Sequence, residues 1–457
     1  MEPAPTPEGT HPPIEVSFRE ALGVWWRIGL QSFGGPAGQI ALMHRIIVDE
    51  RRWLDEPRFL HALNFCMLLP GPEAQQLATY AGWLLHGVRG GVVAGTLFIL
   101  PGALAMLALS WLYVLAGASP AMEGLFFGLK AAVLAIVAQA LIRIASRALH
   151  GAWGAALAGG GFVALYAFDL PFPLVVLAAG LVGWIVARFH DSPFATPTHG
   201  SGEHAAAAVG ASRRAGRGSG SGRAALVCAA LWIATVALTF LLPESDQVYR
   251  EIATFFSKLA VVTFGGAYAV LSYVAQQGVD HYQWLAPGEM LDGLGLAETT
   301  PGPLILVTQF VGFLAAFRAA APEYALLAGS AGALLTTWVT FLPCFLWIFL
   351  GAPHVERLRR QPALSAALAA ITAAVVGVIA NLAVWFGTHF LFADHVRITS
   401  WGLELVVPVA SSLDVPALIL ASVALALVFG ARLGVPAVLV ITAALGIGWQ
   451  FLGIPSP

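Results

Sequence analysis

FREALGVWWRIGLQSFGG, residues 18–35, occurs twice in this chain and returns as YREIATFFSKLAVVTFGG, residues 249–266. The next apolar motif also returns, because LLPGPEAQQL at 68–77 is followed 231 residues later by TTPGPLILVT at 299–308. The two copies align at this single offset, without a gap, over more than fifty positions. An internal duplication in an apolar chain is typical of secondary transporters, whose two halves move about a site at their junction.

The composition places the chain in a membrane. Of its 457 residues, 58% are hydrophobic and 11% are charged, whereas about a quarter of the residues in soluble domains are charged. We therefore expect an all-α polytopic protein embedded in the lipid bilayer. The net charge of −2 gives no basic field that would favour nucleic acid as a partner.

Motifs of enzymes and of cofactor sites are not found in a suitable setting. HExxH, GxSxG, CxxC and a glycine-rich nucleotide loop are all missing. Cys66, Cys228 and Cys344 are scattered through apolar segments, so we expect buried apolar residues rather than a disulfide or a metal site. We expect no enzyme activity, no cofactor and no metal.

Two stretches without apolar periodicity bound the repeats. Residues 1–16 have no basic segment ahead of an apolar core, so we expect a short disordered cytoplasmic tail rather than a cleaved signal peptide. Residues 190–223 are rich in Gly, Ser, Ala and Arg and are expected to be a flexible cytoplasmic linker. The linker separates a first repeat, residues 17–189, from residues 224–457, which hold one linking span and the second repeat.

A helix needs about 20 apolar residues to cross the hydrocarbon core. About nine full spans are expected, at residues 91–116, 122–148, 151–167, 173–189, 224–242, 324–350, 363–386, 415–430 and 433–453. Four further apolar segments are broken by Gly and Pro, around residues 33–36, 70–72, 264–266 and 301–303. Each break leaves two half-helices, which fit a re-entrant hairpin that lines a wet cavity.

Charges in the loops predict that the two repeats have inverted topology. The loop at 44–58 carries four arginines, whereas its repeat counterpart at 276–290 carries no Lys or Arg. The next pair of loops reverses this bias, since 117–123 is bare and 353–360 carries three arginines. Short cytoplasmic loops concentrate Lys and Arg, so corresponding loops face opposite sides. If the FGG segments crossed the membrane fully, the halves would be parallel and the missing basic residues would be unexplained.

The duplicated breaks predict a site for a compact oxyanion. Pro72 stands where a helix begins, so the amides of the following residues and the positive end of the helix dipole are free to meet an anion. If the four breaks converge near the membrane midplane, these donors surround one cavity. Alternatively, Gly and Pro only allow helices to cross closely. The expected substrate-binding residues at the breaks are Ser32, Gly34, Gly35, Pro70, Gly71, Pro72, Ala74, Gln75, Gln76, Thr263, Gly265, Gly266, Thr300, Pro301, Gly302 and Pro303.

Charged residues near the breaks add two hypotheses. Arg27 and Lys258 each lie seven residues before a Gly-Gly pair and would suit a dianion, although both could instead extend to the lipid headgroups. Lys130 has no charged counterpart and ranks lower. Glu73 follows the first PGP motif in an apolar context and could carry a proton across. Its alternative role is a first-turn acid that interacts with the helix dipole, and Glu298 is a weaker candidate for proton coupling.

Four stretches of the chain resemble the chromate ion transporter family in its long, two-domain form. They are SFGGPAGQIALMHR, VDERRWLDEPRFLHALNFCMLLPGPEAQQLATYAGWLLHG, TFGGAYAVLSYV and TPGP. The resemblance covers nearly the whole chain except the N-terminal tail and the linker. It implies a bacterial cytoplasmic (inner) membrane protein that exports chromate and confers chromate resistance. The driving force would be the proton gradient, with the protein as an antiporter, or the membrane potential. Transport of sulfate or another oxyanion, a passive anion channel of the same architecture, and a homodimer stay open.

Overall fold

The computed structural model describes residues 16–116, 119–149, 151–189, 220–264, 266–354, 362–400 and 403–452. Nearly all of the expected N-terminal tail and linker lie outside these residues, as does Gly265. The prediction of an all-α polytopic membrane protein is confirmed for the described chain. Six described helices are long and apolar enough to cross a membrane, and shorter apolar helices accompany them.

Before the linker, the helices are α1 (Phe18–Gln31), α2 (Gly35–His44), α3 (Glu56–Cys66), α4 (Glu73–Ala116), α5 (Pro120–Ala148), α6 (Gly151–Tyr166) and α7 (Phe172–Phe189). After it come α9 (Ser221–Thr239), α10 (Gln247–Val262), α11 (Ala267–Ala275), α12 (Pro287–Thr299), α13 (Val307–Ala319), α14 (Ala325–Gly351), α16 (Pro362–Leu391), α17 (Val415–Leu425) and α18 (Val435–Phe451). Short π-helical turns are η1 (Arg45–Glu50), η3 (Gln276–His281) and η8 (Ala426–Gly430). Short 3₁₀ turns are η2 (Glu244–Asp246), η4 (Leu304–Leu306), η5 (Pro322–Tyr324), η6 (Ala352–His354) and η7 (Ala410–Ser412).

A β-hairpin follows α16 and was not foreseen from the sequence. Strands β1 (His395–Ser400) and β2 (Leu403–Pro408) pair antiparallel, with His395 opposite Pro408. Val, Ile and Thr in β1 favour a strand, but two such short runs between apolar spans give a weak signal. The amide of Glu404 in β2 donates to the carbonyl of Ala167, 2.8 Å away, which fixes the hairpin to the end of α6.

The segments around both FGG motifs fold back on themselves. Gly34, Gly35 and Gly266 have φ of 84°, 70° and 100°, a region that glycine adopts at little cost. In the first copy, Arg51, which follows η1, forms an ion pair of 3.0 Å with Glu20 at the start of α1. The segment formed by α2 and η1 therefore runs antiparallel to α1. In the second copy, the rings of Phe255 in α10 and Tyr282 after η3 lie 5.7 Å apart. Both segments are therefore hairpins, as the sequence predicts.

The second PGP segment is a hairpin as well, and it leads into a close helical turn. Arg318 at the end of α13 forms an ion pair with Glu289 at the start of α12, so α12 and α13 run antiparallel. The close turn that follows α13 leads into α14. In the first half, the turn at the equivalent position lies inside α4, where His86 and Gly87 are not helical. A side chain at Gly82 would come within 2.4 Å of the carbonyl oxygen of Gly90, so α4 also doubles back.

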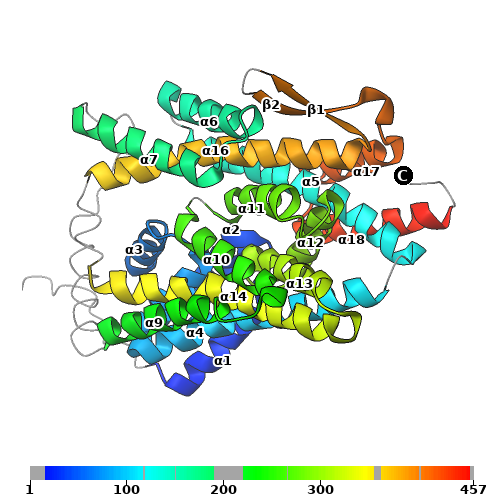
Figure 1. Ribbon diagram of the computed structural model, residues 1–457. Helices are drawn as coiled ribbons and strands as arrows, with labels where there is room; N and C mark the ends of the chain where they lie inside the picture. The colour runs from blue at the N-terminus through cyan, green and yellow to red at the C-terminus, as the bar shows by residue number, and fades with distance from the viewer. Residues whose placement is uncertain are drawn as a thin grey trace, which may run out of the picture.

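The helices form two bundles, and each half of the chain contributes to both. One, the hairpin bundle, consists of α1–α4 and α9–α14, where α14 packs on α4, α9, α10 and α13. The other, the outer bundle, consists of α5–α7 and α16–α18, where α16 packs on α5, α6 and α7 and α18 packs on α5. Figure 1 shows α6, α7 and α16 along one side of the molecule and α1, α4 and α9 along the other. The duplication thus built both bundles.

Small residues bring the outer bundle together. A side chain at Gly128 of α5 would come within 2.1 Å of the Thr442 carbonyl oxygen in α18. Likewise, one at Gly377 of α16 would lie 1.9 Å from the Ala158 carbonyl oxygen in α6. Within lipid, helix association depends on such close backbone packing rather than on a hydrophobic driving force. These glycines therefore specify which helices meet.

Candidate functional site

Each PGP break is joined to the FGG turn of the other half. The amide of Gly71 donates to the carbonyl of Thr263 at 2.9 Å, and the amide of Gly302 donates to the carbonyl of Ser32 at 2.8 Å. Gly71 and Gly302 occupy equivalent positions in the two repeats, as do Ser32 and Thr263. The exchange is reciprocal, so the breaks do come together, but the amides of Gly71 and Gly302 are already used within the protein.

Buried glutamines brace this joint. The Gln39 side chain donates to the Gly302 carbonyl at 2.6 Å, and the Gln76 side chain donates to the Pro70 carbonyl at 2.7 Å. Gln75 donates to the Thr79 hydroxyl at 3.0 Å. The Oε1 atoms of all three glutamines are buried without a hydrogen-bond partner among the described residues. Buried polar atoms without partners are costly, and because these amide oxygens only accept hydrogen bonds, they are a cost of the joint rather than ligands for an oxyanion.

A cavity of about 410 Å³ opens beside the joint, between the two bundles. We call it the central cavity. Both FGG turns line it, through Gly34 and Gly35 in one half and Gly266 in the other. Its remaining lining comes from Pro36, Ala37, Ile40, Met67, Glu73, Ile136, Gln139, Ala140, Arg143, Ile144, Arg147, Ala148, Ala267, Tyr268, Glu298, Thr372 and Val435.

The central cavity has features that favour an anion. Helices α2 and α11 begin at its wall, at Gly35 and Ala267, and the first turn of a helix presents free amides and the positive end of its dipole. Arg143 and Arg147 of α5 also line it, and neither forms an ion pair with any described residue. Two cations and two helix ends match a doubly negative ion.

Two carboxyl groups share the cavity with these cations. Glu73 is the first residue of α4, and Glu298 lies near the end of α12. Glu298 is 7% exposed and accepts a hydrogen bond of 2.8 Å from the Tyr268 hydroxyl. Glu73 and Glu298 are therefore both placed where their charge state affects an anion in the cavity.

The other residues expected to bind substrate lie outside the cavity lining. Arg27 is half exposed and lies 3.7 Å from Glu50 in an ion pair, while Lys258 lies 5.8 Å from the ring of Tyr273. Ser32 and Thr263 are buried and donate to carbonyls of their own helices. The remaining predicted residues that do not line the cavity are Pro70, Gly71, Pro72, Ala74, Gln75, Gln76, Thr300, Pro301, Gly302 and Pro303.

Sequence reasoning missed Arg143 and Arg147. The available signal was their spacing of four residues near the end of an apolar span, which places both on one helix face. Lys130, the lower-ranked cation, instead forms an ion pair of 3.1 Å with buried Asp292, which also accepts a 3.0 Å hydrogen bond from Tyr113. Among the described residues, no group of three His, Cys, Asp or Glu is arranged to hold a metal.

Comparison with known proteins identifies the family. The sequence profile described as "Chromate transporter" matches residues 19–184 and 250–449. The chain belongs to the chromate transporter family. It is 32% identical to the "Chromate transport protein" of Pseudomonas aeruginosa over 379 residues, which is 82% of each chain. It is 27% identical over 372 residues to the protein of the same name from Cupriavidus metallidurans, covering 81% of this chain and 82% of the relative.

A third relative matches over a longer stretch. The "Probable chromate transport protein" of Synechococcus elongatus is 26% identical over 403 residues, covering 85% of this chain and 91% of the relative. No solved structure matched the chain significantly. Members of the chromate transporter family are transporters, not enzymes, and the apolar helices make this member a multi-pass protein of the bacterial inner membrane.

Proposed function

We propose that this member of the chromate transporter family exports chromate from the cytoplasm, with the central cavity as its binding site, and so confers chromate resistance. One observation carries the proposal. Both duplicated FGG turns, two helix N-termini and two arginines without ion-pair partners among the described residues face one cavity between the bundles. Chromate is a tetrahedral dianion, so backbone amides and two guanidinium groups suit both its charge and its shape.

Loop charges support an inverted arrangement of the two repeats, with the N-terminus and the linker in the cytoplasm. The Arg-rich linker follows α7 directly, and basic residues near spans favour the cytoplasm. Helices α6 and α7 lie between α5 and the linker, so the end of α5 belongs on the linker's side. Arg143 and Arg147 therefore lie in the cytoplasmic half, which suits a cavity that loads from inside.

The membrane potential supports export as the favoured direction. Moving a dianion out of a cell with a negative interior releases about 4.6 kcal/mol per 100 mV, at roughly 2.3 kcal/mol per charge. Export can therefore run on the potential alone. Antiport against protons is the second mode of coupling, and we propose Glu73 as the residue that binds the coupled proton because it faces the substrate cavity.

An alternating-access transporter fits better than a passive channel. A second cavity, lined among others by Asn381 and His389, lies further along α16 than the central one. Leu271 of α11 and Val375 and Ile379 of α16 lie in the intervening helical turns, and all three are fully buried. An apolar layer thus separates the cavities, and helix movement is needed to join them.

Uptake of labelled chromate into inverted membrane vesicles tests the proposal. The pH gradient and the potential are imposed separately, and sulfate is added as competitor. We expect saturable uptake when the vesicle lumen is positive, inhibition by sulfate at higher concentration than chromate, and loss of uptake in Arg143→Gln. Saturable uptake of sulfate without competition by chromate would identify a sulfate transporter. Linear, non-saturating flux would identify a channel.

A further inference from the structure

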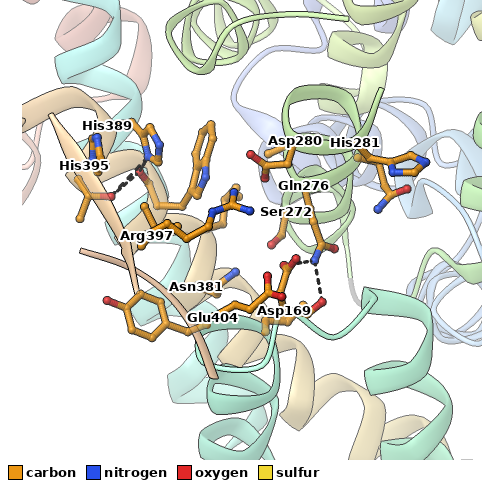
Figure 2. A pocket seen from close by; sticks show the side chains of 18 of the residues that line it. Asp169, Ser272, Gln276, Asp280, His281, Asn381, His389, His395, Arg397 and Glu404 are labelled. Atoms are coloured by element: carbon orange, nitrogen blue, oxygen red, sulfur yellow. Dashed lines mark hydrogen bonds between the residues drawn. The ribbon is translucent and has the colours of Figure 1, made fainter. Parts of the chain in front are cut away.

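A cavity of about 540 Å³ lies at the far end of helices that also line the central cavity (Figure 2). We call it the second cavity. On α11 the central cavity is lined by Ala267 and the second by Ala275, and on α16 by Thr372 and Asn381 respectively. The nearest lining residues on α11 are Tyr268 and Ser272, so at 1.5 Å per residue the two cavities are about 6 Å apart along α11 and about 14 Å apart along α16. They are two openings on one line between the bundles.

The α16 wall of the second cavity is the repeat counterpart of the α5 wall of the central cavity. Helices α5 and α16 align at an offset of 242 residues, through AAVLAIVAQALIRIAS at 131–146 and AAVVGVIANLAVWFGT at 373–388. The side chains of α5 in the central cavity therefore correspond to side chains of α16 in the second. The matched pairs are Gln139 with Asn381, Ala140 with Leu382, Arg143 with Trp385, and Arg147 with His389.

The charges differ between the matched cavities. Both arginines of α5 are replaced on α16, by a tryptophan and a histidine. Carboxylates of Asp169, Asp280 and Glu404 line the second cavity together with one guanidinium group, that of Arg397. Figure 2 shows Arg397 reaching in from β1 between Asp280 and the other two carboxylates. Three carboxylates share the cavity with this one guanidinium group, so negative charge is in excess.

The walls of the second cavity are otherwise built for polar solutes. Ser272 is 6% exposed, lines the cavity and donates no side-chain hydrogen bond to any described residue. The side chain of Gln276 donates to the carboxylate of Asp169, drawn as a dashed line in Figure 2, and thereby connects η3 to the loop between α6 and α7. The β-hairpin covers the cavity from the side of Arg397.

We propose that the second cavity is the external mouth of the transport path and that its carboxylates keep external divalent oxyanions, sulfate above all, from binding there. This inference rests on the proposed function, because it assumes that the central cavity carries the anion outward. Its sidedness follows from the bare loop at 276–290, which borders the cavity, whereas basic loops mark the opposite face. By formal charge the central cavity is balanced, with two arginines and two glutamates, whereas the second cavity has three carboxylates and one arginine, so the anion binds more weakly in the second cavity.

Coulomb's law gives the size of the effect. Three carboxylate charges about 8 Å from a dianion weaken its binding about two-hundredfold in unscreened water, and salt reduces this to several-fold. The lower dielectric constant of a cavity strengthens the repulsion between the carboxylates and the dianion. Neutralising the carboxylates should therefore strengthen external sulfate binding roughly tenfold.

Efflux from right-side-out vesicles loaded with labelled chromate tests this inference, with sulfate added outside. Burial and the neighbouring Asp169 raise the pKa of Asp280, which lies beyond the membrane-crossing helices, and Arg397 opposes the shift. The assay is therefore run at about pH 8, where ordinary imidazoles are neutral and carboxyl groups are ionised. We expect the sulfate concentration that halves efflux to fall roughly tenfold in the triple variant Asp169→Asn, Asp280→Asn, Glu404→Gln.

Arg397→Gln should shift the half-inhibitory sulfate concentration in the opposite direction. It makes the second cavity more negative, so the half-inhibitory sulfate concentration should rise, whereas a merely structural disturbance would shift both variants in the same direction. Glu323→Gln is the matched control, since Glu323 is an exposed carboxylate in η5 outside the cavity lining. Its sulfate sensitivity should stay that of the unmodified protein.

The outcomes separate the two proposals. Equal sulfate sensitivity in the triple variant and the unmodified protein, or shifts of the same sign in the triple variant and Arg397→Gln, would overturn the inference. Absence of chromate efflux from the unmodified protein would instead overturn the proposed function. Size-exclusion profiles in detergent confirm that each variant is folded before its efflux is compared.

Discussion

Replacing Gly71 by alanine tests the joint between a PGP break and the opposite FGG turn. Gly71 has φ of 121°, and an added Cβ would lie 2.9 Å from both the Cys344 sulfur and the Gln76 side-chain nitrogen. The backbone conformation alone costs alanine about 1–3 kcal/mol. Displacing those neighbours also weakens the 2.9 Å hydrogen bond from the Gly71 amide to Thr263, worth about 1 kcal/mol. We expect Gly71→Ala to lose about 2–4 kcal/mol at the joint.

A graded series of glycine variants separates strain from contact. Gly302 and Gly266 also have positive φ, of 93° and 100°, but an added Cβ at Gly302 comes no closer than 3.3 Å to a neighbour, and at Gly266 it meets nothing within 4 Å. Gly23 lies in α1 with open space around it, so Gly23→Ala should stabilise slightly, by about 0.5–1 kcal/mol. Loss of stability should therefore be largest at Gly71, smaller at Gly302 and Gly266, and reversed at Gly23.

Thermal unfolding in detergent and chromate uptake into inverted vesicles measure the two consequences. Gly71→Ala should insert into the membrane, unfold at a lower temperature and lose chromate uptake, while Gly23→Ala keeps it. If Gly71→Ala transports chromate normally and unfolds no earlier than Gly23→Ala, the exchange of hydrogen bonds between the halves does not hold the transport machinery together.

Further expectations concern charge and topology. Arg143→Gln should weaken chromate binding about tenfold to a hundredfold, because it removes a charge-assisted hydrogen bond; isothermal titration with unchanged affinity would remove Arg143 from the site. Glu73→Gln should flatten the dependence of uptake on an imposed pH gradient, and an unaltered dependence would exclude Glu73 as proton carrier. Arg27→Gln should leave chromate affinity near that of the unmodified protein, since the side chain pairs with Glu50 outside the cavity; a large loss would restore it as a ligand. Single cysteines at Arg51 and His281, in a background without the native cysteines, should react with impermeant reagents from opposite sides of the membrane; labelling from one side would contradict inverted repeats.

Hydropathy and repeat spacing predicted the elements well, because lipid imposes simple rules on them. Every apolar segment expected to cross the membrane coincides with a described helix or helix pair, since a spanning backbone must satisfy its own hydrogen bonds. Gly and Pro at residues 33–36 and 301–303 also located the hairpins. The sequence did not predict which broken segment of one half contacts which broken segment of the other half. That depends on packing between halves, as in the bond from Gly302 to Ser32.

The site was predicted only in part, and the reason is geometric. Gly34, Gly35, Gly266 and Glu73 were found because a motif marks them and they line the central cavity. Arg27 looked equally suitable because it lies seven residues before a Gly-Gly pair. That position along the helix does not show which side of the helix faces a cavity until the neighbouring elements are known. Its partner Glu50 comes from η1, and that contact exists only because the hairpin folds back.

The asymmetry between the repeats bears on the proposed export of chromate, whose net direction is set by the chromate gradient and the membrane potential. Two identical halves in inverted orientation would give both faces of the membrane the same anion affinity, and neither face would be preferred for loading. Here Arg143 in one cavity corresponds to Trp385 in the other, and Glu73 after the first PGP motif corresponds to Leu304 after the second. The backbone exchange at Gly71 and Gly302 is the same in both halves, so this joint has kept the symmetry of the duplication. Charge has diverged at the cavity walls, and on the proposed export path this difference would favour release of the anion through the second cavity while leaving the two arginines of the central cavity to capture it.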